Sequence, residues 1–329
     1  MSSSVDGVLV QWGDRLFYPC NRSVQDRAPR LHGARGRAQT IRARIEATVR
    51  RAPQVMVKVT GGGRGMKAIA AHFRYISKNG RLEIEDDRGV VERGREILGD
   101  LDRQWRYGGA LIDDDGDRRE AFNVMLSMQR GIDPLIVQKA AREFAKIEFA
   151  DHRYVMVLHD HQANPHVHLS VKAESKHGVR LNPRKADLHR WREVFAQRLQ
   201  EWGIDAEATR QVTRGRWRSP DALWRRKAKE EGRRQGGPTE ASSRASSGLS
   251  RRESLAAWRQ IALALETSDS REDRALAKDI VDFVREMPVT RADVWLRREM
   301  PHTALDRVPG APLVQCVSDH GRKGPNIER

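Results

Sequence analysis

The pattern of apolar and polar residues changes character close to residue 53. Residues 1–52 have no sustained apolar period and include an arginine-rich run at 35–44, which is typical of a poorly ordered basic extension. Residues 55–60 are rich in valine and end in three glycines, which predicts a strand that enters a turn. Apolar residues then recur at steps of three and four from Met66 to Ile76, and this spacing predicts a helix ended by Asn79 and Gly80.

Further strands and helices follow up to residue 209. Residues 122–128 have the pattern of a strand, and Asp133-Pro134 is the start signal of a helix with an apolar stripe that includes Ile147. Residues 154–159 and 166–173 predict two adjacent antiparallel strands joined by a short turn. Asn182-Pro183 precedes another helix. Residues 81–120, earlier in the chain, are polar, with short strand-like pieces and an acidic turn at 113–117. The pattern therefore predicts an α/β domain of the α+β type at 53–209.

The rest of the chain differs in composition from this domain. Residues 210–235 are basic with helical spacing, and residues 236–250 are rich in glycine, serine and threonine, which is typical of a linker. Two helical patterns at 255–265 and 276–284 predict a small helical region at 251–329, whose last part, from Pro301, has no period and is expected to be loose.

Charge indicates the kind of partner. Lys and Arg outnumber Asp and Glu by 61 to 45, a net charge of +16, which favours a polyanion such as nucleic acid. Most of this excess lies in 1–52 and 210–235, so we expect a near-neutral core held on nucleic acid by two basic flanks. Two cysteines exclude a disulfide framework or a cysteine-ligated zinc cluster. The polar start and the short apolar stretches predict neither a signal peptide nor an integral membrane segment, and we expect a cytoplasmic protein.

Four histidines lie within ten residues, at His159, His161, His166 and His168. Side chains alternate along a strand, so His166 and His168 point the same way while Val167 faces the core. An antiparallel neighbour that ends at His159 brings a third imidazole beside them. Three neutral imidazoles leave positions open on a divalent ion and suit manganese, zinc, iron, nickel or copper.

The histidine element His166-Val167-His168 resembles that of the conjugative relaxases, or mobilisation nucleases, of the HUH endonuclease superfamily. The resemblance includes the upstream His159, Asn164-Pro165, and residues 71–80, which are similar to the family's tyrosine motif. It also includes residues 123–127 with Gly131 and Pro134, and it covers about residues 53–205.

The resemblance implies a central antiparallel sheet flanked by helices and a site-specific nuclease. Such an enzyme nicks and rejoins single-stranded DNA at the transfer origin of a plasmid or mobile element. Tyr75 is then the nucleophile, and it forms a 5′-phosphotyrosyl intermediate. The ion, Mn²⁺ or Mg²⁺, with Zn²⁺ or another as an alternative, is held by His159, His166 and His168. Further partners are accessory mobilisation proteins and a coupling or secretion apparatus.

Several roles around this core stay open. Asp160 and His161 are both candidates for the general base or for orienting a ligand imidazole, and Asn164 is a supporting residue. The family's nucleophile commonly lies near the N-terminus, which keeps Tyr18 as an alternative to Tyr75.

Cations on both sides of the two motifs are candidate DNA contacts. The candidates near the tyrosine helix are Arg64, Lys67, Arg74 and Lys78. Those after the histidine strand are Arg180, Arg184 and Lys185. The basic segment adds Arg214, Arg216 and the stacking candidate Trp217.

Three other functions fit parts of the pattern. A rolling-circle replication initiator of the same superfamily would share both motifs. A cupin-type metal enzyme also uses a His-x-His strand pair, but the glutamate here, Glu174, comes six residues after His168. A non-catalytic DNA-binding mobilisation accessory protein would retain the basic residues without needing Tyr75.

Overall fold

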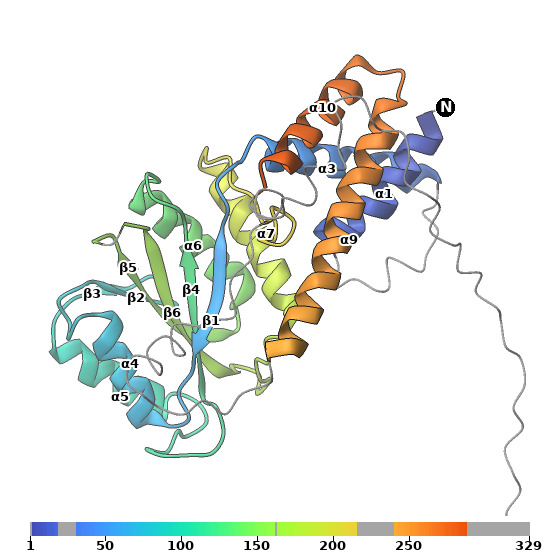
Figure 1. Cartoon of the computed structure of the whole chain (residues 1–329). Coiled ribbons are helices and arrows are strands. Elements are labelled where there is room, and N and C mark those ends of the chain that lie inside the picture. The colour runs from blue at the N-terminus through green and yellow to red at the C-terminus, as the bar shows by residue number, and fades with distance from the viewer. Residues whose placement is uncertain (1, 19–30, 162, 216–239, 288–329) are drawn as a thin grey trace, which may run out of the picture. The chain divides into compact units, whose positions relative to one another are not determined.

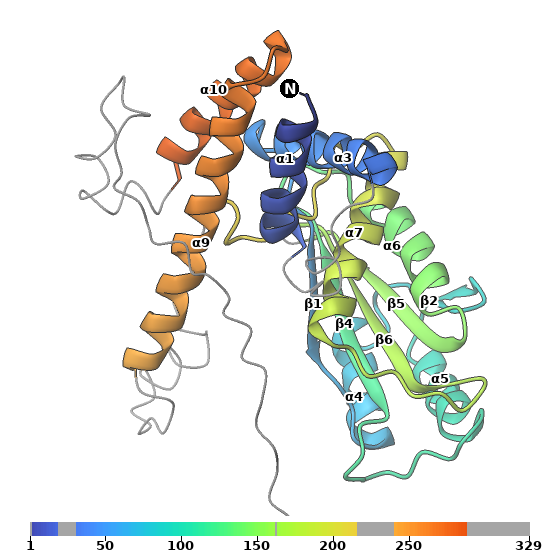
Figure 2. The same ribbon diagram turned by 90° about the vertical axis from the view of Figure 1, so that its right-hand side faces the viewer.

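A computed structural model describes residues 2–18, 31–161, 163–215 and 240–287. Its centre is a six-stranded antiparallel sheet in the order β1-β4-β6-β5-β2-β3, with β1 at one edge (Figures 1 and 2). The strands are β1 (Met56–Gly61), β2 (Ile84–Asp86), β3 (Val91–Glu92), β4 (Ala121–Ser127), β5 (His152–His159) and β6 (His166–Ser175). The α+β class with a central antiparallel sheet is therefore confirmed.

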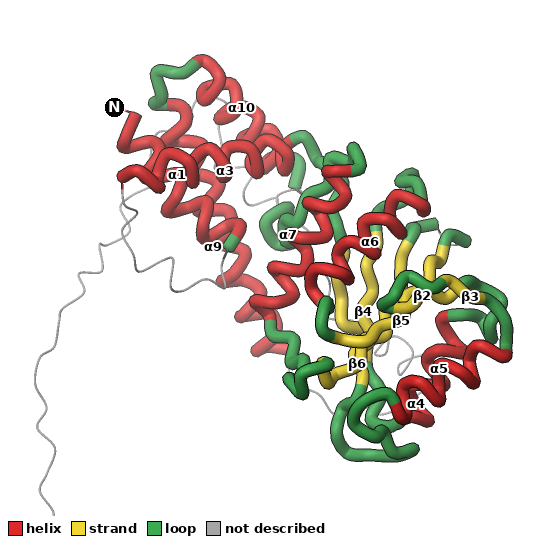
Figure 3. Tube along the Cα trace, turned by 180° about the vertical axis from the view of Figure 1, so that it is seen from behind, coloured by secondary structure: helices red, strands yellow, loops and turns green. Residues whose placement is uncertain are grey.

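Helices cover the sheet in two layers, which Figure 3 shows on opposite sides of the strands. The four helices are α4 (Met66–Ile76), α5 (Glu96–Tyr107), α6 (Pro134–Glu148) and α7 (Lys185–Glu201). α6 and α7 pack on the face formed by Val57, Leu126 and Leu169, and α4 and α5 pack on the face that includes Val155 and Val157.

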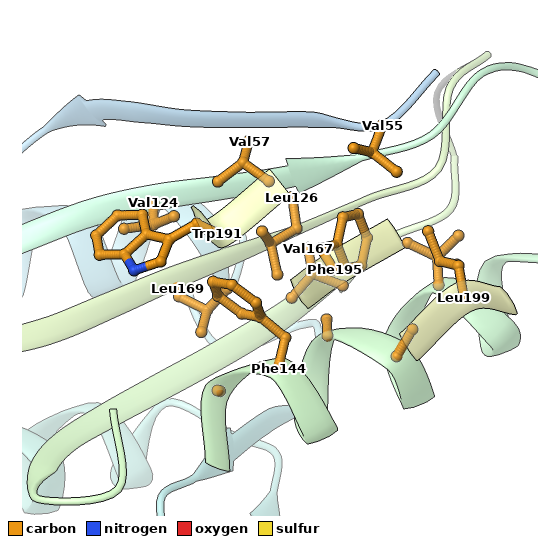
Figure 4. Packing of buried hydrophobic residues seen from close by; sticks show 14 of the residues in the cluster. Val55, Val57, Val124, Leu126, Phe144, Val167, Leu169, Trp191, Phe195 and Leu199 are labelled. Atoms are coloured by element: carbon orange, nitrogen blue, oxygen red, sulfur yellow. The ribbon is translucent and has the colours of Figure 1, made fainter. Parts of the chain in front are cut away.

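The core under α6 and α7 is aromatic (Figure 4). Phe144 of α6 is fully buried, and its ring makes edge-on contacts with Phe149, Trp191 and Phe195. α6 begins as predicted, because the Asp133 side chain accepts a hydrogen bond from the Leu135 amide and Pro134 occupies the first turn. Replacing such a buried ring with alanine lowers the free energy of unfolding by about 3–5 kcal/mol. This layer therefore stabilises the sheet from the face opposite α4 and α5.

Two local expectations differ from the structure. Ile147, placed in the α6 stripe by its spacing, is 52% exposed because the buried face of α6 runs instead through Ala140, Phe144 and Ala145. The polar stretch 81–120 contains the helix α5, which buries only Leu101 and Trp105. Such a narrow apolar stripe, interrupted by Gly99, carries too weak a period to be recognised without its partner helix.

The described part of the N-terminal 52 residues is helical, so the expectation of a poorly ordered extension is wrong for it. It contains α1 (Ser2–Phe17) and α3 (Leu31–Val49), which pack with α9 (Glu240–Glu266) and α10 (Arg271–Arg285). Leu9 and Ile41 are fully buried against residues such as Trp258 and Ile280 of the later helices. The N-terminal pattern lacked a clear period because its burial depends on helices about 200 residues farther along the chain.

The predicted linker at 236–250 is also different, because α9 already begins at Glu240. The two predicted C-terminal helical patterns lie within α9 and α10. The expected loose tail from Pro301 and most of the basic segment 210–235 fall outside the described residues. No helix among the described residues is both long and apolar enough to cross a membrane.

Candidate active site

Three histidines converge where the β5–β6 hairpin closes. His159 ends β5 directly opposite His166, which begins β6, and His168 follows two residues later on the same face. One nitrogen from each ring lies within 4.8 Å of the other two, and the ring centroids are 4.6–5.0 Å apart. The antiparallel pairing expected from the sequence therefore builds the triad.

The ring nitrogens show that this triad fits a metal ion. Nδ1 of His166 lies 2.9 Å from the Asn164 carbonyl, and Nε2 of His159 lies 2.7 Å from the Ile76 carbonyl. A carbonyl oxygen can only accept a hydrogen bond, so the ring nitrogen that faces it carries the proton. The other nitrogen of each ring therefore keeps its lone pair. Nδ1 of His168 is buried and has no hydrogen-bond partner. Three oriented imidazoles with open lone pairs are the donor set of a divalent transition ion.

Burial also keeps the rings of His159 and His168 in the protonation state that binds metal. It lowers the pKa of His159, and it lowers the pKa of His168 to about 3, with the neighbouring imidazoles adding to the effect. A histidine with such a pKa is neutral at pH 7, and only the neutral ring has a lone pair to offer.

Tyr75 is presented by the helix α4. Ile69, Phe73 and Ile76 are buried toward the sheet, while Tyr75 lies on the flank of the helix and is 70% exposed. The Ile76 carbonyl that accepts from His159 belongs to the residue next to Tyr75. The end of the tyrosine helix is therefore tied directly to the triad.

His72 connects the tyrosine to the histidines and was not singled out from the sequence as a site residue. Its ring stacks against Tyr75, with centroids 6.2 Å apart, and meets His168 edge-on at 6.4 Å. Its Nε2 is buried without a hydrogen-bond partner, and burial lowers the pKa of His72 to about 4. The spacing of three residues between His72 and Tyr75, which puts both on one helix flank, is a signal that could have identified it.

A tight turn fixes where α4 ends. Lys78 and Asn79 have positive φ, and Gly80, at φ 79°, passes so close to the Gly94 carbonyl that a Cβ would lie 2.2 Å from it. Ser77 accepts a hydrogen bond from the Gly80 amide. Glycine is required here because any side chain would displace the turn that follows Tyr75.

Residues 78–204 match the protein family described as relaxase, MobA/VirD2-like, nuclease domain. This part of the chain is similar to a relaxase nuclease domain, and we call the sheet with its four helices the relaxase domain. The match contains all three histidines and begins three residues after Tyr75, so α4 and β1 lie outside it. No curated protein matches the chain.

The three residues predicted to support the triad are all exposed but differ in what they contact. His161 is exposed, and its ring centroid lies 5.2 Å from that of His159. Asn164 is exposed and contributes its main-chain carbonyl to His166. Asp160 is exposed.

Tyr18 lies away from the triad. Its ring packs edge-on against His189 of α7, which covers the opposite face of the sheet, and beside the guanidinium groups of Arg37 and Arg44. Burial raises the pKa of Tyr18. The structure therefore separates this alternative tyrosine from the histidines.

The predicted DNA contacts fall into three groups. Arg64, Lys67, Arg74 and Lys78 are exposed around α4, and within the described ranges no carboxylate lies within ion-pair distance of them. Arg184 and Lys185 are exposed at the start of α7, in the helix layer opposite the triad.

The third group is engaged elsewhere or not described. Arg180 pairs with Glu120 and Glu174 and donates to the Arg119 carbonyl, and Arg214 is half-buried and donates to the Ala52 carbonyl. Arg216 and Trp217 lie outside the described residues.

The arginine-rich run of the N-terminal region is committed to internal ion pairs. Arg37 binds Asp14, Arg42 binds Asp6 and Asp273, and Arg44 binds Glu193. These arginines join α3 to α1 and α10, which together with α3 and α9 form the helical bundle, and to α7 of the relaxase domain. The expectation that this run acts as a DNA-holding arm is therefore wrong for these three residues, because carboxylates distant in sequence neutralise them.

Proposed function

We propose that this protein nicks and rejoins single-stranded DNA at a transfer origin, with Tyr75 as the nucleophile. The relaxase domain supports DNA nicking in general. The observation that favours Tyr75 is its position: the His72 ring stacks against this exposed phenol and also meets His168 of the triad.

In this reaction the Tyr75 oxygen attacks the phosphorus of one phosphodiester. The bond from phosphorus to the 3′ oxygen breaks, the tyrosine proton passes to a base, and the leaving oxygen takes up a proton. The 5′ phosphate stays on Tyr75, so the free 3′ hydroxyl can attack this linkage and rejoin the strand. Asp160 and His161 are the candidate bases, and His161 lies beside the triad.

His159, His166 and His168 would hold a divalent ion. When bound, the ion would act as a Lewis acid that neutralises charge growing on the phosphate. Of the two ions that the resemblance implies, Mn²⁺ suits three imidazoles better, because Mg²⁺ prefers oxygen ligands.

A cupin-type enzyme fits the structure less well. Its glutamate ligand has no equivalent here, because Glu174 lies six residues along β6 from His168, about 20 Å away, and pairs with Arg180. The sheet is also open rather than closed into a barrel, because the edge strands β1 and β3 each pair with one neighbouring strand only.

The test is covalent capture of DNA. Labelled single-stranded oligonucleotides that tile the region around the gene are incubated with the protein and Mn²⁺, and adducts that survive denaturation are measured. We expect an adduct with wild type and a loss of at least about 100-fold in Tyr75→Phe. Tyr107→Phe is the matched control, because Tyr107 is 67% exposed at the end of α5, and its adduct should be unchanged.

The metal centre is tested separately. His168→Ala should lose Mn²⁺ binding in calorimetry and form no adduct, while it still binds single-stranded DNA.

An adduct that persists in Tyr75→Phe would move the nucleophile to another residue. DNA binding without any wild-type adduct would favour the accessory-protein function.

A further inference from the structure

Among the described residues, α4 and α5 cover only part of the sheet face that carries the triad. α4 and α5 bury Val155 and Val157 of β5, but no β1 residue belongs to their apolar cluster. On β1, Val57 and Val59 point to the core under α6 and α7, whereas Lys58 and Thr60 lie on the histidine face and are exposed. An open strip of sheet therefore extends from the triad to the β1 edge.

Lys58 and His168 stand in one row across this strip. Lys58 pairs with Met125 of β4, and Met125 pairs with His168 of β6. Neighbouring strands are about 4.8 Å apart, so the two Cα atoms are separated by roughly 10 Å. A lysine side chain that reaches along this row ends beside the triad.

The polar residues around Lys58 are already bonded to one another. Thr60 donates to the Asn123 carbonyl, and Ser170 donates to the Asn123 side chain. Lys58 has no carboxylate within ion-pair distance in the described part of the chain. An ammonium group that has no ion-pair partner among the described residues, on a face where it is next to Met125 and near neutral polar groups, is suited to an anion that approaches from solvent.

We infer that Lys58 binds a backbone phosphate adjacent to the one held at the triad, so that the DNA strand crosses the sheet from β6 toward β1. This inference rests on the proposed function for the identity of the ligand. A compact ammonium charge on a flexible stem contacts phosphate without reading bases, so Lys58 contributes affinity rather than sequence choice.

The test measures single-strand binding as a function of salt. Each phosphate contact on a single strand contributes about 0.7 to the slope of log K against log salt concentration. Lys58→Met should lower this slope by about 0.7 and weaken binding roughly 5–10-fold at low salt, and Lys58→Arg should restore most of both. Lys146→Met is the matched control, because Lys146 is exposed on α6, on the opposite face of the sheet, and should leave the slope unchanged.

Adduct formation separates this inference from the proposed function. Lys58→Met should reach the wild-type adduct yield at saturating DNA and require more DNA for half of it. An unchanged slope in Lys58→Met, beside a normal wild-type adduct, would overturn the Lys58 contact alone. A wild type without any adduct, but with a slope that depends on Lys58, would overturn the transesterase and support the phosphate contact.

Discussion

Two basic regions of this protein use their charge in opposite ways. On α3, the side chains of Arg37, Arg42 and Arg44 end on carboxylates of other segments at 2.7–2.9 Å. Around the tyrosine helix and on β1, Lys58, Lys67 and similar cations are exposed without such partners in the described residues.

The difference shows that the local density of positive charge does not locate a DNA surface. A cation that holds an internal carboxylate has already lost its hydration and its counterion to that partner, and it offers little to a phosphate. An unpartnered cation keeps condensed anions that DNA can replace, and their release drives binding. We therefore propose a DNA path along α4 and β1 rather than along α3.

The largest effect is expected when the cations of α4 are removed together. A variant with Arg64, Lys67, Arg74 and Lys78 changed to Gln should lose single-strand affinity by on the order of 100-fold, and its salt slope should fall by about 3. Fluorescence anisotropy over a series of salt concentrations measures both. The control Arg50→Gln/Arg51→Gln, in pairs that are more than half exposed, should bind normally. Equal losses in the two variants would remove the contrast between the regions.

Breaking the central pair of α3 should affect stability instead. Arg42 donates to both Asp6 and Asp273, so Arg42→Met leaves the buried carboxylate of Asp273 and the half-buried one of Asp6 without their ion-pair partner. We expect the free energy of unfolding to fall by about 2–3 kcal/mol. Urea denaturation measures this loss, and the affinity for single-stranded DNA should stay within about twofold of wild type. A large loss of affinity in the folded variant would make α3 part of the DNA surface.

The same ion pair should give the bundle a defined acid sensitivity. Burial raises the pKa of Asp273, but hydrogen bonds from Arg42 and Ser268 outweigh this and hold the pKa below its ordinary value of 3.8. The stabilisation is therefore complete above pH 3.8 and is lost as the pH falls through the folded-state pKa. Asp273→Asn should be less stable than wild type by about 1 kcal/mol at pH 7. Thermal unfolding at several pH values should show this gap closing below pH 3.8, and a constant gap would contradict it.

The smallest effect belongs to the exposed edge of the bundle. Arg51 and Glu286 form an ion pair with both side chains more than half exposed. Solvent and salt screen such a pair, so Arg51→Gln should change the free energy of unfolding by less than about 0.5 kcal/mol. A loss as large as that of Arg42→Met would mean that exposure does not decide the strength of these pairs.

Much of the candidate site could be predicted because its signals are local. The alternation of His166, Val167 and His168 sets which side chains share a face, and the short hairpin places His159 opposite His166. The amphipathic period of α4 likewise puts Tyr75 beside the buried stripe. These are properties of a few consecutive residues and do not depend on distant partners.

Other features depended on residues far apart in the chain. α5 packs on α4 through Trp105, whose ring centroid lies 5.0 Å from that of Phe73, and its own apolar pattern is too weak to predict the helix. The position of His72 between Tyr75 and His168 exists only after α4 has packed on the sheet. Lys58 acquires its place in the row of His168 through the pairing of three strands.

By itself, the sequence determined the histidine hairpin, the tyrosine helix and the mixed class of the domain, because backbone periodicity and turn chemistry act between near neighbours. Only the tertiary structure decided which tyrosine lies beside the histidines and which cations stay unpaired. Both depend on groups that meet across long stretches of chain, and burial and charge pairing are properties of the folded neighbourhood rather than of the residue.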